Sequence, residues 1–139
     1  WLRVLGYDTV YDNRIEDEEI VVRCAYESRI ALTRDRRLVR RRLLHHSLLI
    51  TSTELSAQLR QVLDFIGRTP AYSLLLSRCL ECNTRLVAVP RESIQTVVPP
   101  FVFRTQSDFK LLPSCRRGYW GGTHRKHIQK RLEILLSLH

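Results

Sequence analysis

Hydrophobic positions in the first half of the chain follow two alternating patterns. Three short runs of β-branched, aliphatic and aromatic residues are typical of strands: Thr9–Tyr11, Ile30–Thr33 and Ser47–Thr51. Other hydrophobic residues recur at helical spacing, which predicts helices over 17–27 and 54–66 and a shorter basic helix over 35–42. Strands that alternate with helices imply a small parallel sheet with helices packed against it.

Several single residues mark where these elements begin and end. Gly6 follows Trp1–Leu5 in the position of a helix C-cap, and Gly67 is predicted to end the 54–66 helix. Either Ser52 or Thr53 is predicted to cap the start of that helix. The residues predicted to face inward are Ile20, Val21, Cys24 and Ala25 in the first helix, and Leu55, Leu59, Val62, Leu63 and Ile66 in the second.

The second half of the chain has a different pattern. Short β-like runs at Leu86–Val89 and Phe101–Phe103 are broken by prolines, and a basic helix is predicted from about Thr123 to Leu138. The apolar stripe of that helix consists of Ile128, Leu132, Leu135 and Leu136. We therefore expect two domains, an α/β domain at 1–70 and a β module with a basic C-terminal helix at 71–139.

Composition narrows the class of protein. Of the 139 residues, 44% are hydrophobic and 27% are charged, which excludes a disordered polyampholyte or a collagen-like chain. No uncharged stretch is long enough to span a bilayer, and Arg3 and Asp8 interrupt the apolar start that a signal peptide needs. We expect a cytoplasmic protein with no membrane partner. Methionine is absent and residue 1 is Trp, so we also expect the chain to be part of a longer polypeptide.

The net charge of +9 is unevenly distributed. Residues 1–70 carry 12 basic and 10 acidic side chains, whereas residues 71–139 carry 11 basic and 4 acidic ones. The acids concentrate between Asp12 and Glu19. A basic body with one acidic cluster suits an enzyme that binds a polyanion and holds a cation, although a solvated basic surface is the alternative.

Acidic residues follow two of the predicted strands. Asp17, Glu18 and Glu19 come after the first strand, and Asp35 comes directly after the second. Because parallel strands end at the same edge of a sheet, Asp17 and Asp35, with Glu18, are candidates to hold Mg²⁺ or Mn²⁺ for phosphodiester hydrolysis. The alternative is that these acids complement a helix dipole and that Asp35 is an N-cap.

A run of arginines begins beside this candidate metal site. It contains Arg34, Arg36, Arg37, Arg40, Arg41 and Arg42, with His45 and His46 behind it. Guanidinium groups bind phosphate oxygens in pairs, so the run is a candidate contact for a nucleic acid backbone. A solvated helix face is the alternative interpretation.

The cysteines have the spacing of a zinc knuckle. Cys79 and Cys82 form a C-x₂-C motif, and Cys115 follows in a proline-broken β context. Leu112 stands where a second C-x₂-C pair would have its first cysteine, so His124 is the candidate fourth zinc ligand. Cys24 belongs to a helix face that is predicted to be buried. The alternative for the first three cysteines is that they are free buried thiols.

Aromatic and basic residues lie next to each other near the C-terminus. Tyr119 and Trp120 precede a helix that carries Arg125, Lys126, Lys130 and Arg131. Aromatic rings stack on bases and cations hold phosphates, so this segment is a second candidate RNA contact. At least one of the two rings is expected to pack in the core instead.

Together these motifs resemble one family. The segments that carry the resemblance are 1–9, Asp17-Glu18-Glu19-Ile20, 30–35, 77–83, Pro113-Ser114-Cys115, Tyr119-Trp120 and Gly122-Thr123-His124. They are similar to the Mut-seven C-terminal RNase domain, in which a PIN-like nuclease fold is joined to a zinc ribbon. The resemblance implies a small PIN-like parallel sheet with flanking helices, followed by a zinc-ribbon-like β module and a C-terminal helix.

The resemblance also implies metal-dependent cleavage of RNA. It assigns acidic roles to Asp17 and Asp35 and zinc roles to Cys79, Cys82 and Cys115. Two features depart from the family: members begin upstream with a strand that bears another Asp, and Leu112 replaces a zinc cysteine. The alternative function is a non-catalytic RNA-binding zinc-ribbon module with a vestigial acidic site.

Overall fold

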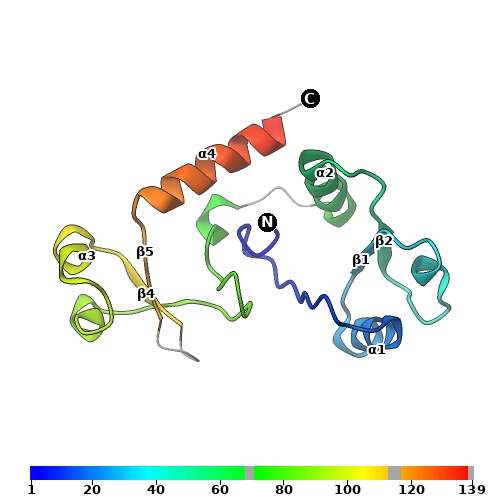
Figure 1. Ribbon diagram of the computed structural model, residues 1–139, viewed down its shortest axis with the longest axis horizontal. Coiled ribbons are helices and arrows are strands. Elements are labelled where there is room, and N and C mark those ends of the chain that lie inside the picture. The colour runs from blue at the N-terminus through cyan, green and yellow to red at the C-terminus, as the bar shows by residue number, and fades with distance from the viewer. Residues whose placement is uncertain (68–70, 113–116, 138–139) are drawn as a thin grey trace. The chain divides into compact units, whose positions relative to one another are not determined.

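The chain is divided into two compact units (Figure 1). The computed structural model describes residues 1–67, 71–112 and 117–137, without the side chains of Tyr72, Thr123, His124 and Ser137. The "parallel unit" is the contiguous segment Tyr11–Thr69, and the "knuckle unit" combines Trp1–Val10 with Pro70–His139. The division into domains at residue 70 stays a prediction; in the packing, the first ten residues belong with the second half of the chain.

Two parallel strands form the centre of the parallel unit. Its elements are α1 (Asp17–Glu27), β1 (Ala31–Thr33), the 3₁₀ helix η1 (Leu38–Arg40), β2 (Ser47–Leu49) and α2 (Leu55–Ile66). β1 and β2 pair in parallel, with Ala31 opposite Ser47 and Thr33 opposite Leu49. The prediction of an α/β chain with a small parallel sheet and flanking helices is therefore confirmed, although both strands are shorter than their hydrophobic runs.

The inner face of α1 packs on the strands as its spacing predicts. The buried cluster consists of Val21, Ala31, Leu38 and Leu44, with Ile20 and Cys24 packed against it. Ala25 is exposed, contrary to the prediction. The larger side chains of Ile20, Val21 and Cys24 make the contacts of α1 with this cluster. The hydrophobic residues of the helix, strand and connection together make a small core.

α2 follows its predicted pattern closely. Leu59, Val62 and Leu63 are buried on one face, whereas Leu55 lies at the first turn and is largely exposed. Gly67 ends the helix with φ of +60°, as predicted. The predicted start is wrong by one or two residues: Glu54 is the N-cap, and the hydroxyl of Ser52 accepts the N–H of Glu54 at 3.0 Å before the helix begins.

Two predicted elements of the first half do not form. Residues 35–42 contain only the three-residue η1, because five of the eight residues are arginines and only Leu38 and Val39 are hydrophobic. Thr9–Tyr11 is not a strand, because the carbonyl of Thr9 accepts a hydrogen bond from Arg3 and its N–H donates to the side chain of Asn83. Because side chains already satisfy the backbone N–H and C=O of Thr9, these groups do not pair with a neighbouring strand.

The knuckle unit starts with a helical turn that ends at Gly6. The N–H of Tyr7 donates to the carbonyl of Leu2 at 3.0 Å, and the N–H of Gly6 donates to that of Arg3 at 3.1 Å. These two bonds form a Schellman motif, so the predicted helix end is confirmed. Gly6 has φ of +88°, and a Cβ built there would lie 2.5 Å from the carbonyl oxygen of Leu74.

The rest of the knuckle unit is organised around a three-stranded antiparallel sheet. Its elements are η2 (Tyr72–Leu74), β3 (Val87–Ala88), η3 (Arg91–Ile94), α3 (Pro100–Thr105), β4 (Phe109–Leu111), β5 (Gly118–Trp120) and α4 (Thr123–Ser137). β4 lies between β3 and β5, with Phe109 opposite Trp120. Phe109 packs with Ile94 and Val98 in a buried cluster.

The predicted β-like run at Phe101–Phe103 is wrong, because these residues belong to helix α3. Pro100 stands at the first helical position, where its fixed φ favours a helix and its missing N–H costs nothing. Phe103 then reaches the core, with its ring centroid 6.3 Å from that of Phe109. The C-terminal helix is confirmed as α4, with Leu132 fully buried. Within the described ranges, no helix has the length and apolar character needed to cross a membrane.

Candidate functional site

The first turn of α1 lies beside the connection that leaves β1. Only Ser28–Ile30 separates α1 from β1, so the helix runs back along the strand and its acidic start lies toward the strand's end. An exposed ion pair joins the two segments: Nη2 of Arg41, just after η1, lies 2.7 Å from Oε1 of Glu18. The sequence prediction that acidic and arginine residues meet at this sheet edge is consistent with this contact.

Asp35 is held by its own turn. Its N–H donates to the hydroxyl of Thr33 at 3.0 Å, and its Oδ1 accepts the N–H of Arg37 at 2.6 Å. This is an Asx turn, in which a side chain organises the backbone two residues on. The carboxylate keeps a second oxygen and is exposed to solvent. Asp35 is thus neither the N-cap of a long helix nor a buried group.

The described carboxylates differ in what they have available for a cation. The carboxylate of Glu18 is paired with Arg41, whereas the carboxylate of Asp17 makes no hydrogen bond or ion pair with any other residue that the structure describes. In residues 1–67, 71–112 and 117–137, no three His, Cys, Asp or Glu side chains gather to hold a metal ion. Asp17 and Asp35 therefore provide hard oxygen donors of the kind that Mg²⁺ and Mn²⁺ prefer, but not a complete protein cage.

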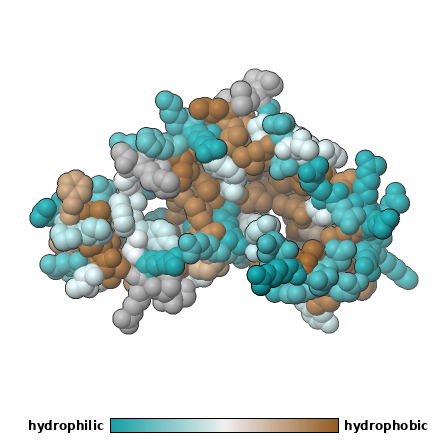
Figure 2. All heavy atoms as spheres, in the orientation of Figure 1, coloured by the Kyte–Doolittle hydropathy of each residue, from teal (hydrophilic) through white to brown (hydrophobic). Residues whose placement is uncertain are grey.

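The arginine run covers the connection between β1 and β2 with exposed charge. Arg34, Arg36, Arg37, Arg40, Arg41 and Arg42 are all exposed. Figure 2 shows hydrophilic side chains over this part of the molecule, at the right of the view. Because the segment forms only a 3₁₀ turn, its cations are not restricted to one helix face.

The C-x₂-C motif forms a knuckle at the end of a hairpin. Arg78 and Arg85 bridge as antiparallel neighbours, the N–H of Cys79 donates to the carbonyl of Thr84, and the N–H of Asn83 donates to that of Cys79 at 3.0 Å. Asn83 has φ of +65°, in the left-handed region that asparagine tolerates best after glycine. This tight turn carries both cysteines, as their spacing predicts.

The two knuckle cysteines have different surroundings. Cys79 is buried, and the hydroxyl of Tyr119 donates to its Sγ at 3.3 Å. Cys82 is exposed, with its Sγ 3.4 Å from the hydroxyl oxygen of Thr84. Hydrogen bonds from the Thr84 hydroxyl and backbone lower the pKa of the Cys82 thiol to about 7. Burial raises the pKa of Cys24, which packs on the core of the other unit.

Residues on β5 and just before it contact the knuckle. Tyr119 reaches Cys79, and the guanidinium of Arg117 pairs with the carboxylate of Glu81 inside the C-x₂-C motif. Leu112, on the opposite side of this second hairpin, is fully buried and donates its N–H to the carbonyl of Arg117. Of the predicted zinc ligands, Cys115 and the side chain of His124 lie outside the described residues.

The residues that join the C-x₂-C turn to the first segment of the chain carry no sequence signal. Nη1 of Arg3 donates to the carbonyls of Leu80 and Glu81, each at 2.7 Å. Nδ2 of Asn83 donates to Oδ1 of Asp8 at 2.8 Å. These partners lie more than 70 residues apart in the chain, so no local pattern indicates the contact.

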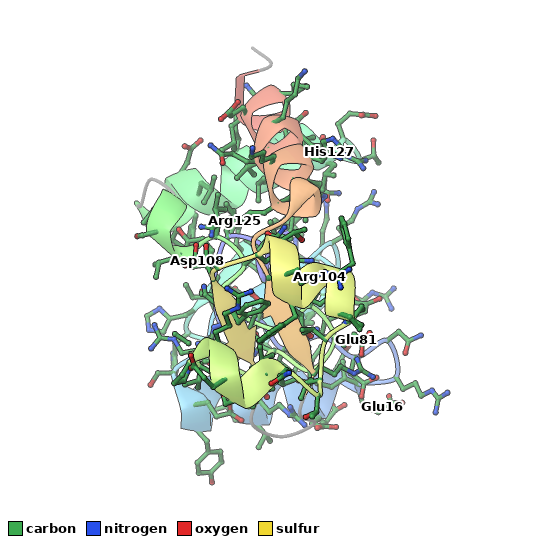
Figure 3. The ribbon with its side chains drawn as sticks, turned by 90° about the vertical axis from the view of Figure 1, so that its left-hand side faces the viewer. Glu16, Glu81, Arg104, Asp108, Arg125 and His127 are labelled. Atoms are coloured by element: carbon green, nitrogen blue, oxygen red, sulfur yellow. The ribbon has the colours of Figure 1, made fainter. Side chains whose placement is uncertain are left out.

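The basic residues predicted near the C-terminus lie on α4. Arg125 is half-buried and Lys126 is exposed, and Figure 3 labels Arg125 and His127 on this helix, with Arg104 on α3. Trp120, which ends β5, is exposed over 42% of its surface, whereas Tyr119 turns toward Cys79. Tyr119 is half-buried, and its hydroxyl contact with Cys79 is the inward contact that the structure gives it.

Comparison with known families identifies the chain. The family model described as Mut7-C RNAse domain matches residues 1–132. No curated protein and no solved structure matches the chain. Since the match covers nearly all of the 139 residues, including the acidic, cysteine and aromatic motifs, the chain belongs to the Mut7-C RNase domain family.

Proposed function

We propose that this domain hydrolyses RNA phosphodiester bonds with Mg²⁺ or Mn²⁺ held by Asp17 and Asp35. Membership of an RNase-domain family implies a ribonuclease-type function with RNA as substrate. The observation that supports the site is the Glu18–Arg41 pair, which joins the acidic start of α1 to the segment that leaves β1. The end of parallel strands is where α/β folds most often bind ligands. A PIN-like fold for the parallel unit is part of this proposal.

Each residue then has a distinct role. A divalent ion at this edge would neutralise phosphate charge and activate water. Asp17 and the second oxygen of Asp35 are the donors for the ion, and the Asx turn keeps the Asp35 carboxylate in position. Arg34 and Arg36, adjacent to Asp35, bind the phosphates on either side. Arg37, Arg40 and Arg41 add positive charge, and Arg41 holds Glu18 back from the ion.

We also propose that the knuckle unit is a zinc ribbon. Cys79 and Cys82 share one tight turn, and the pKa of Cys82 of about 7 favours the thiolate that zinc requires. Arg117 and Tyr119 connect the second hairpin to that turn through their contacts with Glu81 and Cys79. Cys115 and His124 complete the proposed set of ligands. Elemental analysis of the purified protein should find about one equivalent of structural zinc.

A specific observation supports the alternative of a non-catalytic RNA-binding module. The charge of Glu18 is neutralised by Arg41, and one carboxylate oxygen of Asp35 accepts a hydrogen bond from the backbone N–H of Arg37. An acidic site with so few available oxygens binds a metal ion weakly unless RNA phosphates complete the coordination. The alternative keeps the arginine run and the ribbon as RNA contacts and assigns no chemistry to the carboxylates.

Cleavage of single-stranded RNA decides between these functions. The purified protein is assayed with Mn²⁺ and with EDTA, alongside the variants Asp35→Asn and Asp17→Asn. Each should lose at least about a hundredfold in rate, because an amide cannot supply the charge that holds the ion. Asp64→Asn, at an exposed position of α2, is the matched control and should cleave normally. Cleavage that continues in EDTA would contradict the metal-dependent reaction.

A further inference from the structure

The solvent-facing side of α4 is rich in basic residues, and its other exposed residues are Gln129, Glu133 and Ile134. Its exposed cations are Lys126, His127, Lys130 and Arg131 when histidine is protonated, and at 3.6 residues per turn they fall within an arc of about 140°. The opposite side of the helix carries the fully buried Leu132, with Ile128 and Leu135 half-buried beside it. The helix is thus anchored by one side and presents its charge on the other.

The two lysines of this side of α4 are not used in ion pairs with the residues that the structure describes. Among the described residues, no carboxylate forms an ion pair with Lys126 or Lys130, and the first turn of α4 contains no acid. Glu133, the acid within the helix, accepts a hydrogen bond from Gln129 at 3.4 Å. Arg131 lies with its guanidinium carbon 5.6 Å from the centroid of the Trp1 ring, which leaves its charge uncompensated.

An exposed aromatic ring lies at the entrance to this helix. A Cβ on Gly122 would lie 3.3 Å from Cδ1 and 3.4 Å from Nε1 of Trp120, so the indole packs against the backbone where α4 begins. Trp120 nevertheless exposes 42% of its surface. Successive strand residues point to opposite faces, so β5 directs Tyr119 to the knuckle and Trp120 to the face of its β4 partner Phe109, where the indole stays partly exposed.

We infer that Trp120 and the basic face of α4 form a binding site for single-stranded RNA. The inference rests on the proposed function for RNA as the ligand, and it assigns the recognition to the knuckle unit rather than to the acidic edge. Trp120 stacks on a base, while Lys126 and Lys130, about 6 Å apart along the helix axis, bind neighbouring phosphates.

The aromatic ring is what favours a single strand. Bases in an A-form duplex are paired and stacked inside the helix, so an exposed indole finds no free base face there. A single strand offers both its bases and its phosphates, which matches a ring beside a row of unpaired cations. An acidic polypeptide could form ion pairs with Lys126 and Lys130, but it has no base to stack on the ring of Trp120.

Binding is measured by fluorescence anisotropy with labelled single-stranded RNA of mixed sequence, in EDTA so that metal-dependent cleavage cannot occur. The double variant Lys126→Ala/Lys130→Ala should weaken binding at least about tenfold and reduce the slope of log affinity against log salt by about 1.4, or 0.7 per phosphate contact. Arg85→Ala/Arg104→Ala is the matched control, since it removes two exposed cations of the same unit and should change affinity less than about threefold.

The ring is tested separately. Trp120→Ala should weaken binding about tenfold, and Trp120→Phe should recover most of the loss because it keeps a stacking surface. Circular dichroism confirms that each variant is folded. Equal losses in the control and lysine double variants would overturn the site, as would equal competition by duplex RNA or by polyglutamate. Absence of binding by the unaltered protein would also overturn it.

The two proposals fail in different ways. If single-stranded RNA binds through α4 but is not cleaved with Mn²⁺, the proposed hydrolysis fails and this site stands. If RNA is cleaved but the α4 and Trp120 variants bind it normally, this site fails and the hydrolysis stands.

Discussion

Both units of the molecule form exposed ion pairs, such as Arg117–Glu81 in the knuckle unit, but they differ in what else their arginines contact. In the parallel unit the arginines pair with nearby acids at the surface, as in Arg23–Glu19, Arg29–Glu27 and Arg41–Glu18. In the knuckle unit Arg3 and Arg78 donate to backbone carbonyls of distant segments. Exposed ion pairs contribute little to stability, whereas hydrogen bonds from a charged group to otherwise unsatisfied carbonyls contribute more. The comparison indicates that arginine joins distant segments of the chain through backbone carbonyls in the knuckle unit, whereas in the parallel unit it forms surface ion pairs.

The largest expected effect concerns the close contact between Gly6 of the first segment and Leu74 in the knuckle unit. Gly6→Ala should reduce the free energy of unfolding by about 3 kcal/mol, because φ of +88° is unfavourable for alanine and the new Cβ would meet the carbonyl of Leu74. Gly67→Ala, at φ of +60° but in open space in the parallel unit, should cost only about 1 kcal/mol. Urea unfolding measures both.

Gly121→Ala is the control for these glycine substitutions. No atom lies within 4 Å of a Cβ built at Gly121, so its stability should change by less than about 0.5 kcal/mol. If Gly6→Ala were as harmless as this control, the close approach of the first segment to Leu74 would be wrong.

A smaller effect compares arginines of the two units. Arg3→Ala should cost about 2 kcal/mol, since it leaves the carbonyls of Thr9, Leu80 and Glu81 without their donor. Arg41→Ala removes an exposed ion pair and should cost less than about 1 kcal/mol. Thermal unfolding of the two variants is the measurement, and equal losses would remove the contrast between the units.

The smallest effect concerns the reactivity of the thiols. In metal-free protein, alkylation of Cys82 by iodoacetamide should accelerate with a midpoint near pH 7, because hydrogen bonds from Thr84 favour the thiolate and lower the pKa. Burial raises the pKa of Cys24, so Cys24 should react only at higher pH. Mass spectrometry of the alkylated peptides follows each site.

Thr84→Ala provides the contrast for that measurement. Without the hydroxyl, the midpoint for Cys82 should move to higher pH, while the profile of Cys24 stays the same. A midpoint for Cys82 that does not move would show that Thr84 is not the cause.

The sequence predicted the parallel unit well because its contacts are local. The stripe of Leu59, Val62 and Leu63 defined α2 to within one residue, and α1 begins and ends where the pattern indicates. The basic segment after Asp35 was wrongly predicted as a helix. Two hydrophobic side chains cannot stabilise a helix that concentrates five positive charges.

The knuckle unit was harder to predict because its stability depends on distant partners. β4 and β5 are only three residues each, so they are stable as strands only when they pair with each other and with β3. Pro99-Pro100 begins a helix at a position where the aromatic residues indicated a strand. For the candidate site, local spacing was sufficient to find the C-x₂-C turn and the acidic edge. Arg3 could not be found in this way, since nothing near it in sequence indicates the carbonyls of residues 80 and 81.

The interrupted make-up of the knuckle unit has a consequence for biosynthesis. Trp1–Val10 is translated before the parallel unit, but its hydrogen-bond partners Arg78 and Asn83 follow some seventy residues later. On the ribosome the parallel unit can therefore fold while the first segment still lacks its partners. Until the knuckle emerges, Val4 and Leu5, which end up buried, are exposed to the cellular environment and are a natural binding site for a chaperone.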